Sequence, residues 1–551
     1  MSLLRKRTVI FVLLPALCLM GVSNTVSAAD PPNPGPASPP PNPAALEELV
    51  RLRMLLGEQQ RQLEEQQRQM EGLRTALERN KETIARLDAL FAPEPTPAAP
   101  SPATPAPPAP QTGEPPAPPH IRIGDAYITP IGFMDFTTVF RSAAAGSGIG
   151  TNFGAIPFNN VPTARLTEIL PNPQNSRIGA RIDTKVRDLH VLAYWESDFL
   201  GNNPGNVAVT SDSNTFRLRL FWVDLSTRKW EILAGQSWSL LTPGRKGISP
   251  LPADIFYSQV VDVNYVAGLT WGRTPQFRAV YHPTTTVAAA ISLEEPQQYI
   301  GGSGGQGSIT FPTNSNIATN YANQLNSGNT TFNVPNLVPD VIGKVAFDPK
   351  VGGLSQHIEV VGLSRTFKVF NPANNRYFTQ SGGGASLNMS FEVVRNLHLI
   401  GNFFASDGGG RWLFGSGPDL IVRGDGSLSS IHAYSTVSGV EYYGSKTLLY
   451  GYYGADYFNR NTAIDLNGRL VGYGYSGSPN TQNRAIQEVT GGLVQTFWKD
   501  PKWGALQFMF QYAYFTRAPW FVAFGQPKNA HNSTVFVNLR YAFPGAPPVI
   551  K

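Results

Sequence analysis

Residues 177–186 read RIGARIDTKV, and the stretch alternates between two kinds of side chain. Its odd-numbered positions carry Arg177, Arg181, Asp183 and Lys185 with one glycine, whereas its even-numbered positions carry apolar residues or threonine. Successive side chains of a β-strand point to opposite faces of the sheet. One face of this strand therefore suits lipid and the other suits water, which is typical of a transmembrane β-strand.

The same alternation recurs through residues 120–551. The sixteen runs that carry it lie near 128–138, 176–187, 188–200, 214–226, 228–238, 275–283, 285–294, 337–348, 356–369, 383–395, 396–406, 430–443, 446–459, 484–497, 503–516 and 532–543. In lipid every backbone amide needs a partner, so such a sheet has to close on itself. The sequence predicts an all-β transmembrane barrel of about sixteen antiparallel strands, and a barrel of that size is expected to enclose a water-filled channel.

The connections between these runs alternate in length. Seven are tight, and eight are long, including 139–175, 239–274, 295–336 and 460–483. Short periplasmic turns that alternate with long external loops are typical of outer-membrane barrels. We therefore expect both ends of the barrel on the periplasmic side of a Gram-negative-type outer membrane, and a lipid bilayer as its surroundings.

The first 119 residues divide into four segments by composition. Residues 1–28 have a basic start, an apolar stretch and a small-residue cleavage site, which indicates a signal peptide. Residues 29–43 form a Pro-rich segment, residues 44–91 lack proline, and residues 92–119 form a Pro/Ala-rich linker. The single cysteine, Cys18, lies in the apolar stretch of the signal, so the exported chain is expected to hold no disulfide and no thiolate metal site.

Residues 44–91 carry a heptad repeat. Apolar residues recur at every seventh position, at Leu49, Leu56, Leu63, Met70, Leu77, Ile84 and Phe91. The layers three residues later include the amides Gln59, Gln66 and Asn80, which favour a defined register. We interpret the segment as a periplasmic coiled coil that joins three chains, so that the protein forms a homotrimer; the alternative is a single solvated helix.

The polar faces of the predicted strands are rich in positive charge. The basic residues on these faces are Arg177, Arg181, Lys185, Arg217, Arg219, Arg278, Lys344 and Arg540, and Asp183, Glu196 and Asp198 occupy the same phase. Arg217 and Arg219 are expected side by side on one wall. Positive side chains in a pore favour anions by Coulomb attraction and by guanidinium–carboxylate or guanidinium–phosphate pairing. The alternative is that these charges only solvate the wall in mutual salt bridges.

The connection 239–274 carries two further candidate pore residues. It follows the fifth predicted strand, and in general porins the corresponding loop folds inward and narrows the pore. Arg245 and Lys246 are the residues that we expect at such a constriction. The alternative is an external loop with a solvated charge pair.

Three motifs resemble the DcaP-like porins. They are Asn175-Ser176-Arg177-Ile178-Gly179, the arginine pair within 214–220, and Gly235-Gln236-Ser237-Trp238-Ser239 followed by a Pro-containing loop. The resemblance implies a sixteen-stranded trimer with an N-terminal periplasmic coiled coil that takes up dicarboxylates and other small anions. Phosphate-selective porins are a neighbouring resemblance.

Other classes of function find little support in the sequence. No Ser/His/Asp arrangement, phosphate-binding loop or pair of histidines at metal-ligand spacing stands out, so we expect no enzyme, no cofactor and no metal site. The net charge of +6 is dispersed over the strands and does not predict nucleic-acid binding. The main alternative is structural: the coiled coil binds peptidoglycan and tethers the outer membrane, with the barrel as its anchor.

Overall fold

The computed structural model describes the chain from residue 120 onward with few gaps. The described residues are Glu71, 120–201, 214–255, 258–303, 305, 307–313, 316–327 and 334–545. The predicted signal peptide, Pro-rich segment, coiled coil and linker therefore lie outside the described residues, apart from Glu71.

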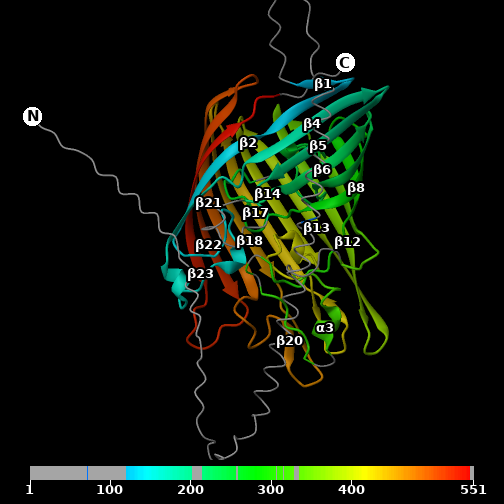
Figure 1. Cartoon of the computed structure of the whole chain (residues 1–551), viewed down its shortest axis with the longest axis vertical. Helices are drawn as coiled ribbons and strands as arrows, with labels where there is room; N and C mark the ends of the chain where they lie inside the picture. The colour runs from blue at the N-terminus through cyan, green and yellow to red at the C-terminus, as the bar shows by residue number, and fades with distance from the viewer. Residues whose placement is uncertain are drawn as a thin grey trace, which may run out of the picture. The chain divides into compact units, whose positions relative to one another are not determined.

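Sixteen antiparallel strands of the described region form one closed barrel (Figure 1). They are β2 (Ala126–Arg141), β4 (Arg177–Val186), β5 (Leu189–Asp198), β6 (Arg217–Ser226), β7 (Trp230–Trp238), β8 (Arg273–Tyr281), β9 (Val287–Glu294), β10 (Asp340–Phe347), β12 (Leu354–Asn371), β13 (Arg376–Val394), β14 (Leu397–Asp407), β17 (His432–Tyr443), β18 (Thr447–Phe458), β21 (Asn483–Asp500), β22 (Gly504–Pro519) and β23 (Ala530–Ala542). The barrel closes because β23 pairs with β22 on one side and with β2 on the other. Each strand overlaps one of the predicted runs, so the predicted strand number is confirmed.

The remaining elements are short and belong to the connections or the strand ends. They are β1 (Ile121–Ile123), η1 (Phe153–Ala155), η2 (Pro162–Arg165), β3 (Glu168–Asn172), η3 (Pro252–Asp254), α3 (Ile317–Tyr321), β11 (Lys350–Val351), η4 (Gly410–Trp412), β15 (Leu420–Val422), β16 (Leu428–Ser430), β19 (Asn461–Ile464) and β20 (Leu470–Tyr473). Within the described part of the chain, no helix has the length and apolar character that a membrane crossing requires.

The two ends of the barrel differ in their connections. Tight turns gather at the end that holds β1, and the longer connections gather at the end that holds α3 and β20 (Figure 1). The predicted runs 356–369 and 383–395 leave a long connection, 370–382, between them, and this prediction is wrong: β12 and β13 stay paired as far as Asn371 and Arg376. Gly382, Gly383 and Gly384 interrupt the apolar alternation here, but backbone pairing does not depend on the side chains and continues through them.

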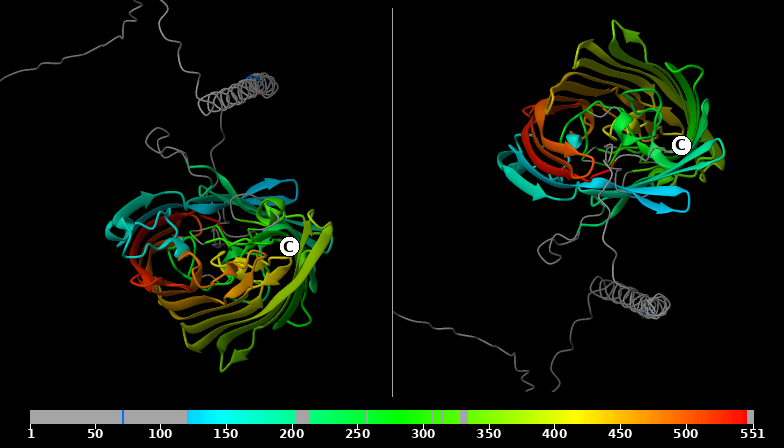
Figure 2. Two further views of the ribbon diagram at one scale, coloured as in Figure 1. Left: turned by 90° about the horizontal axis from the view of Figure 1, so that it is seen from below. Right: turned by 90° about the horizontal axis from the view of Figure 1, so that it is seen from above.

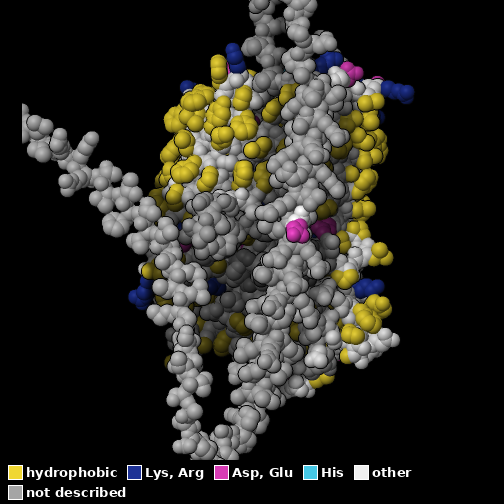
Figure 3. Space-filling view, in the orientation of Figure 1, with side chains coloured by type: hydrophobic (Ala, Val, Ile, Leu, Met, Phe, Trp, Pro, Cys, Tyr) yellow, Lys and Arg dark blue, Asp and Glu magenta, His cyan; other side chains and the backbone are white. Residues whose placement is uncertain are grey.

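The outward faces of the strands are apolar. Large hydrophobic side chains are exposed on nearly every strand, as Phe136 is on β2, Phe221 on β6 and Phe277 on β8. Figure 3 shows them spread over the wall, in a zone with Lys and Arg side chains mainly above and below it. On β4 Ile178 is exposed whereas Asp183 is buried, so the apolar phase faces outward, as the sequence predicts.

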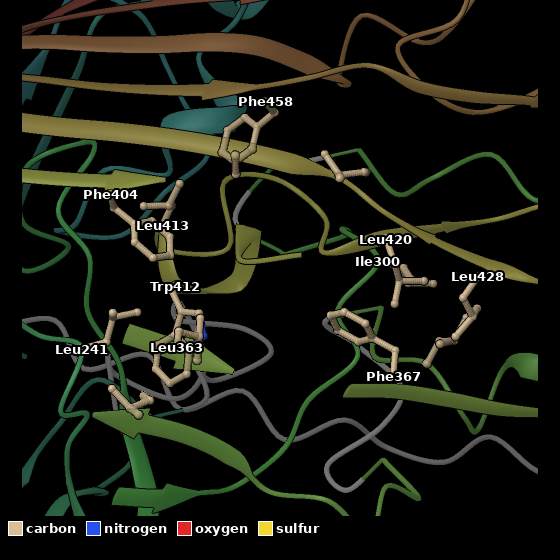
Figure 4. Close-up of a cluster of buried hydrophobic side chains, with 14 of the residues drawn as sticks. Leu241, Ile300, Leu363, Phe367, Phe404, Trp412, Leu413, Leu420, Leu428 and Phe458 are labelled. Carbon is tan, nitrogen blue, oxygen red and sulfur yellow. The ribbon is translucent and has the colours of Figure 1, made fainter. Parts of the chain in front are cut away.

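The interior is not simply filled with water. Viewed end-on, segments of the connections lie within the ring of strands (Figure 2). Their apolar residues pack against the inward side chains of β12, β14 and β18. Figure 4 shows part of this cluster, with Leu241 and Trp412 near Leu363 and with Ile300 and Leu420 near Phe367. The expectation of an interior occupied by water is therefore wrong where this cluster packs, because the long connections carry apolar runs that need burial.

Candidate functional site

The connection between β7 and β8, residues 239–272, folds into the barrel, and we call it the inward connection. Five residues of the wall accept hydrogen bonds from it. Glu359 of β12 accepts from the backbone N–H of Gly244 at 3.1 Å, and Glu441 of β17 accepts from the guanidinium of Arg245 at 2.8 Å. The backbone N–H groups of Gln259, Ala267 and Val261 donate to Tyr452 of β18 (2.8 Å), Glu488 of β21 (2.8 Å) and Gln511 of β22 (2.6 Å), respectively. Swinging this segment outward would leave buried acceptors unpaired, at a cost of about 1–3 kcal/mol each. The inward connection is therefore a fixed part of the lumen.

Two arginines of β6 meet two carboxylates of β5 on the lumen wall. Arg217 donates to Asp198 at 2.8 and 3.0 Å. Arg219 donates to the same carboxylate at 2.6 Å and to Glu196 at 2.8 Å. Arg177 of β4 adds a third guanidinium, 3.4 Å from Glu196. Inward side chains of three strands, β4, β5 and β6, thus meet in one network of ion pairs.

A bulge in β6 lets Arg219 join this network. The register against β5 shifts between Leu218 and Leu220, which leaves Arg219 as the extra residue. A bulge re-aims the side chains that follow it. Arg219 and Leu220 are both buried for this reason, and the inward phase of β6 changes from odd to even positions.

The network continues across the seam that closes the barrel. Phe133 of β2 lies between two guanidiniums, with Arg177 at 5.0 Å and Arg540 at 4.1 Å from its ring. Arg540 of β23 donates to Asp135 of β2 at 2.7 Å. Cation–π contacts of this length are favourable and let two arginines approach one another.

Arg273 at the start of β8 is the fifth arginine of this wall. Its guanidinium lies 5.3 Å from the Trp238 ring and 5.6 Å from the Trp271 ring. Glu196 and Asp198 act on it only at longer range. Among the described residues it has no hydrogen bond and no ion pair, so its charge is available to a solute.

We call Arg177, Arg217, Arg219, Arg273 and Arg540 the arginine cluster. The carboxylates that contact it are Asp135, Glu196 and Asp198. Five positive charges against three negative charges leave an excess of positive charge on this wall. In a confined lumen with low-dielectric walls such an excess raises the local concentration of anions.

A cavity of about 640 Å³ adjoins the cluster near the tight turn between β17 and β18. The charged side chains that line it are Arg177, Lys446, Lys499, Arg540 and Asp262. Asp262 belongs to the inward connection, where burial raises the pKa of its carboxyl above the ordinary value. It accepts hydrogen bonds from the backbone of Thr151 and Asn264. The cavity is thus basic and has the size of a small-molecule site.

The structure distributes the predicted site residues over several places. Arg177, Arg217, Arg219 and Glu196 come together in the network described above. Arg181 and Asp183 form a separate bidentate pair at 2.7 and 2.8 Å. Lys185 is exposed beside a tight turn.

Of the other predicted residues, Arg278 contacts the strands that flank the inward connection, and Arg245 and Lys246 lie on it. Arg278 is buried and donates to the carbonyl oxygen of Trp238 and to Gln276. Arg245 forms a bidentate pair with Glu441, at 2.8 Å for both contacts, and reaches the hydroxyl of Tyr443. Lys246 next to it is exposed.

Some charged residues of the site were not among the predicted ones. Arg273 was overlooked because the predicted strand began at residue 275, which left the arginine in a connection. Asp135 had a usable signal, since it occupies the inward phase of β2 together with Thr137. Lys446 and Lys499 lie beside tight turns. The alternation of apolar and polar residues ends there, so it does not predict whether their side chains face the lumen or the outside of the barrel.

Comparison with known proteins supports the fold. No family model and no curated protein matches the chain. The outer membrane channel DcaP of Acinetobacter baumannii has a TM-score of 0.54 at 16% identity, over 76% of this chain and 97% of that one. An anion-selective porin from Comamonas acidovorans (13% identity, 76% and 100% covered) and OprB of Pseudomonas putida (12%, 75% and 94%) have TM-scores of 0.42 and 0.41, too low to carry an argument. The resemblance to DcaP-like porins that the motifs indicate is thus confirmed in the fold of the barrel, which is that of an outer-membrane channel.

Proposed function

We propose that the protein is a passive outer-membrane channel for small hydrophilic solutes and that it prefers anions such as dicarboxylates. The closed barrel with its apolar outer wall supports residence in a bilayer. Because strands replace helices as the spanning elements, the outer membrane of a Gram-negative-type cell is the location that fits.

The excess positive charge of the arginine cluster carries the anion preference. Arg217 and Arg219 are held by carboxylates, so their positions are fixed, whereas Arg273 has no such partner. A dicarboxylate could pair with Arg273 while its second charge meets the basic cavity. Fixed guanidiniums bind carboxylates in a bidentate manner without reorganising.

The remaining site residues are proposed to act along the same route. The residues proposed for the wall are Arg177, Arg181, Asp183, Lys185, Glu196 and Arg278. Those proposed for a constriction made by the inward connection are Arg245 and Lys246. The N-terminal coiled coil is proposed to stand in the periplasm and to join three chains into a homotrimer. A phosphate-selective channel is the alternative for the solute, since guanidiniums pair with phosphate as well as with carboxylate.

Current measurements in a planar bilayer test the proposal. The expected result is stepwise conductance with a reversal potential that favours anions, and a smaller anion preference in Arg217→Ala/Arg219→Ala. Arg228→Ala/Lys229→Ala is the matched control, because both side chains are exposed at the turn after β6. A protein without conductance, or one that prefers cations, would contradict the proposal. Competition between phosphate and a dicarboxylate for the open pore decides between the two solutes.

A further inference from the structure

Two arginines flank Trp520 at the end of the barrel that carries the long connections. Arg460, which follows β18, and Arg484 of β21 place their guanidiniums 5.9 and 6.0 Å from the Trp520 ring. The indole nitrogen donates to the carbonyl oxygen of Phe458 at 2.9 Å, which holds the ring in place. Its edge contacts Tyr457 at 6.0 Å, and Tyr457 is an outward side chain of β18. One fixed ring, partly buried against the interior apolar cluster, thus has two cations beside it at the ends of β18, β21 and β22.

Both guanidiniums are free to bind an anion. Arg460 and Arg484 are exposed, and neither has an ion pair or a hydrogen bond from its side chain in the described region. Arg460 also lines a cavity of about 330 Å³ with Asp407 and His432. The carboxylate of Asp407 is directed to His432 at 3.4 Å and forms no ion pair with Arg460. Two exposed guanidiniums without an ion pair among the described residues attract an anion.

The position of the site along the barrel indicates where the anion comes from. Tyr434, Tyr457 and Tyr514 are exposed on the outward faces of β17, β18 and β22, close to the ends that carry the long connections. Aromatic side chains collect at the membrane–water interface, at the level of the headgroups. Arg460 and Arg484 therefore lie at headgroup depth on the side of the long connections.

We propose that Arg460, Arg484 and Trp520 bind the phosphate group of a phosphorylated outer-leaflet lipid. Guanidiniums pair with phosphate through parallel N–H bonds, and the indole offers an apolar surface to the adjoining sugar or acyl chain. The inference rests on the proposed outer-membrane location. It does not depend on conduction, because the three residues belong neither to the arginine cluster nor to the inward connection.

Binding of the detergent-solubilised full chain to immobilised lipid A tests the site. Each basic residue near a lipid surface contributes about 1 kcal/mol, so Arg460→Ala/Arg484→Ala is expected to bind roughly 30-fold more weakly than the wild type. Lipid A stripped of its phosphates should bind the wild type as weakly as intact lipid A binds the variant. Arg165→Ala/Arg469→Ala is the matched control, since it removes two exposed arginines elsewhere on the long connections.

Two results would overturn the proposal. The first is equal binding of lipid A by the wild type and by Arg460→Ala/Arg484→Ala, with both proteins in the folded, heat-modifiable form. The second is displacement of lipid A by low concentrations of inorganic phosphate, because the site would then serve free phosphate. Conductance is expected to stay unchanged in the variant, so a failed channel proposal would show in the bilayer recording alone.

Discussion

Several charged side chains of the lumen are bound in pairs, whereas the guanidinium of Arg273 has no ion pair among the described residues. Arg217 and Arg219 contact carboxylates, and Arg181 contacts its own neighbour Asp183. The guanidinium of Arg273 lies beside the rings of Trp238 and Trp271, with Arg217, Arg219 and Asp198 at longer range. At the scale of single residues, the proposed selectivity is therefore best tested at Arg273, because its removal breaks no ion pair within the described residues.

Arg273→Gln is expected to lower the anion-to-cation permeability ratio by about fivefold. A unit charge about 4 Å from a permeating ion contributes roughly 1 kcal/mol in water, and this substitution removes that charge without disturbing an ion pair. The measurement is the reversal potential in a salt gradient. Arg228→Gln, at an exposed turn, should leave the ratio unchanged. An unchanged ratio in Arg273→Gln would show that its charge does not reach the permeating ion.

Among the elements, the inward connection owes its position to a few strong contacts. Arg245 pairs with Glu441 and Tyr443, and Gly244 donates to Glu359. Lys344 reaches both Glu359 and the carbonyl oxygen of Thr242. The connection is tied to the wall by charged groups near its start, which makes Arg245 an anchor as well as a candidate constriction residue.

Arg245→Ala is expected to raise the single-channel conductance, because it frees the first part of the inward connection from β17. Lys246→Ala is the neighbouring control: its side chain is exposed, so the conductance should stay the same. Recordings at one salt concentration compare the two variants. If Arg245→Ala changes only the ion preference and not the conductance, Arg245 supplies charge without restraining the connection.

The closing seam between β2 and β23 contains a buried ion pair. Asp135 has a fully buried side chain and accepts from Arg540 at 2.7 Å and from Asn538 at 2.7 Å. Removing one partner of a buried pair costs about 3–5 kcal/mol, because the other charge stays buried alone. Arg540→Met should therefore lower the free energy of unfolding by that amount, as measured by denaturant titration in detergent.

Asp135→Asn/Arg540→Met is the matched comparison for the seam. It removes both charges together and should recover most of the stability, since no unpaired ion is left. If the double variant is no more stable than Arg540→Met, the two residues do not act as a pair in closing the barrel.

For the whole molecule, the two proposed roles of the N-terminal region give different outcomes. Deletion of residues 44–119 is expected to leave the conductance of each pore unchanged, because the arginine cluster and the inward connection lie entirely within the barrel. Loss of envelope integrity would favour the tether to peptidoglycan, and intact envelope integrity would favour the role in joining three chains. Bilayer recordings and an assay of detergent sensitivity in cells measure the two effects.

The number and positions of the strands could be predicted closely from the sequence, whereas the packing of the connections could not. Each of the sixteen predicted runs overlaps a strand, since alternation is visible within about ten residues. The predicted connection 370–382 was wrong because pairing of β12 with β13 extends past the apolar residues. The apolar cluster formed by Leu241, Trp412 and Leu420 was not foreseen either, since it assembles from connections far apart in the chain.

By itself, the sequence determined that the chain forms a sixteen-stranded wall and which face of each strand meets lipid. The reason is that a strand's two faces are set by neighbouring residues alone. Only the tertiary structure decided which charges meet. Arg219 reaches Asp198 through a bulge, Arg540 reaches Asp135 through the closing seam, and Arg245 reaches Glu441 through a connection folded inside. Register, closure and loop packing depend on contacts between distant segments, and no local pattern contains them.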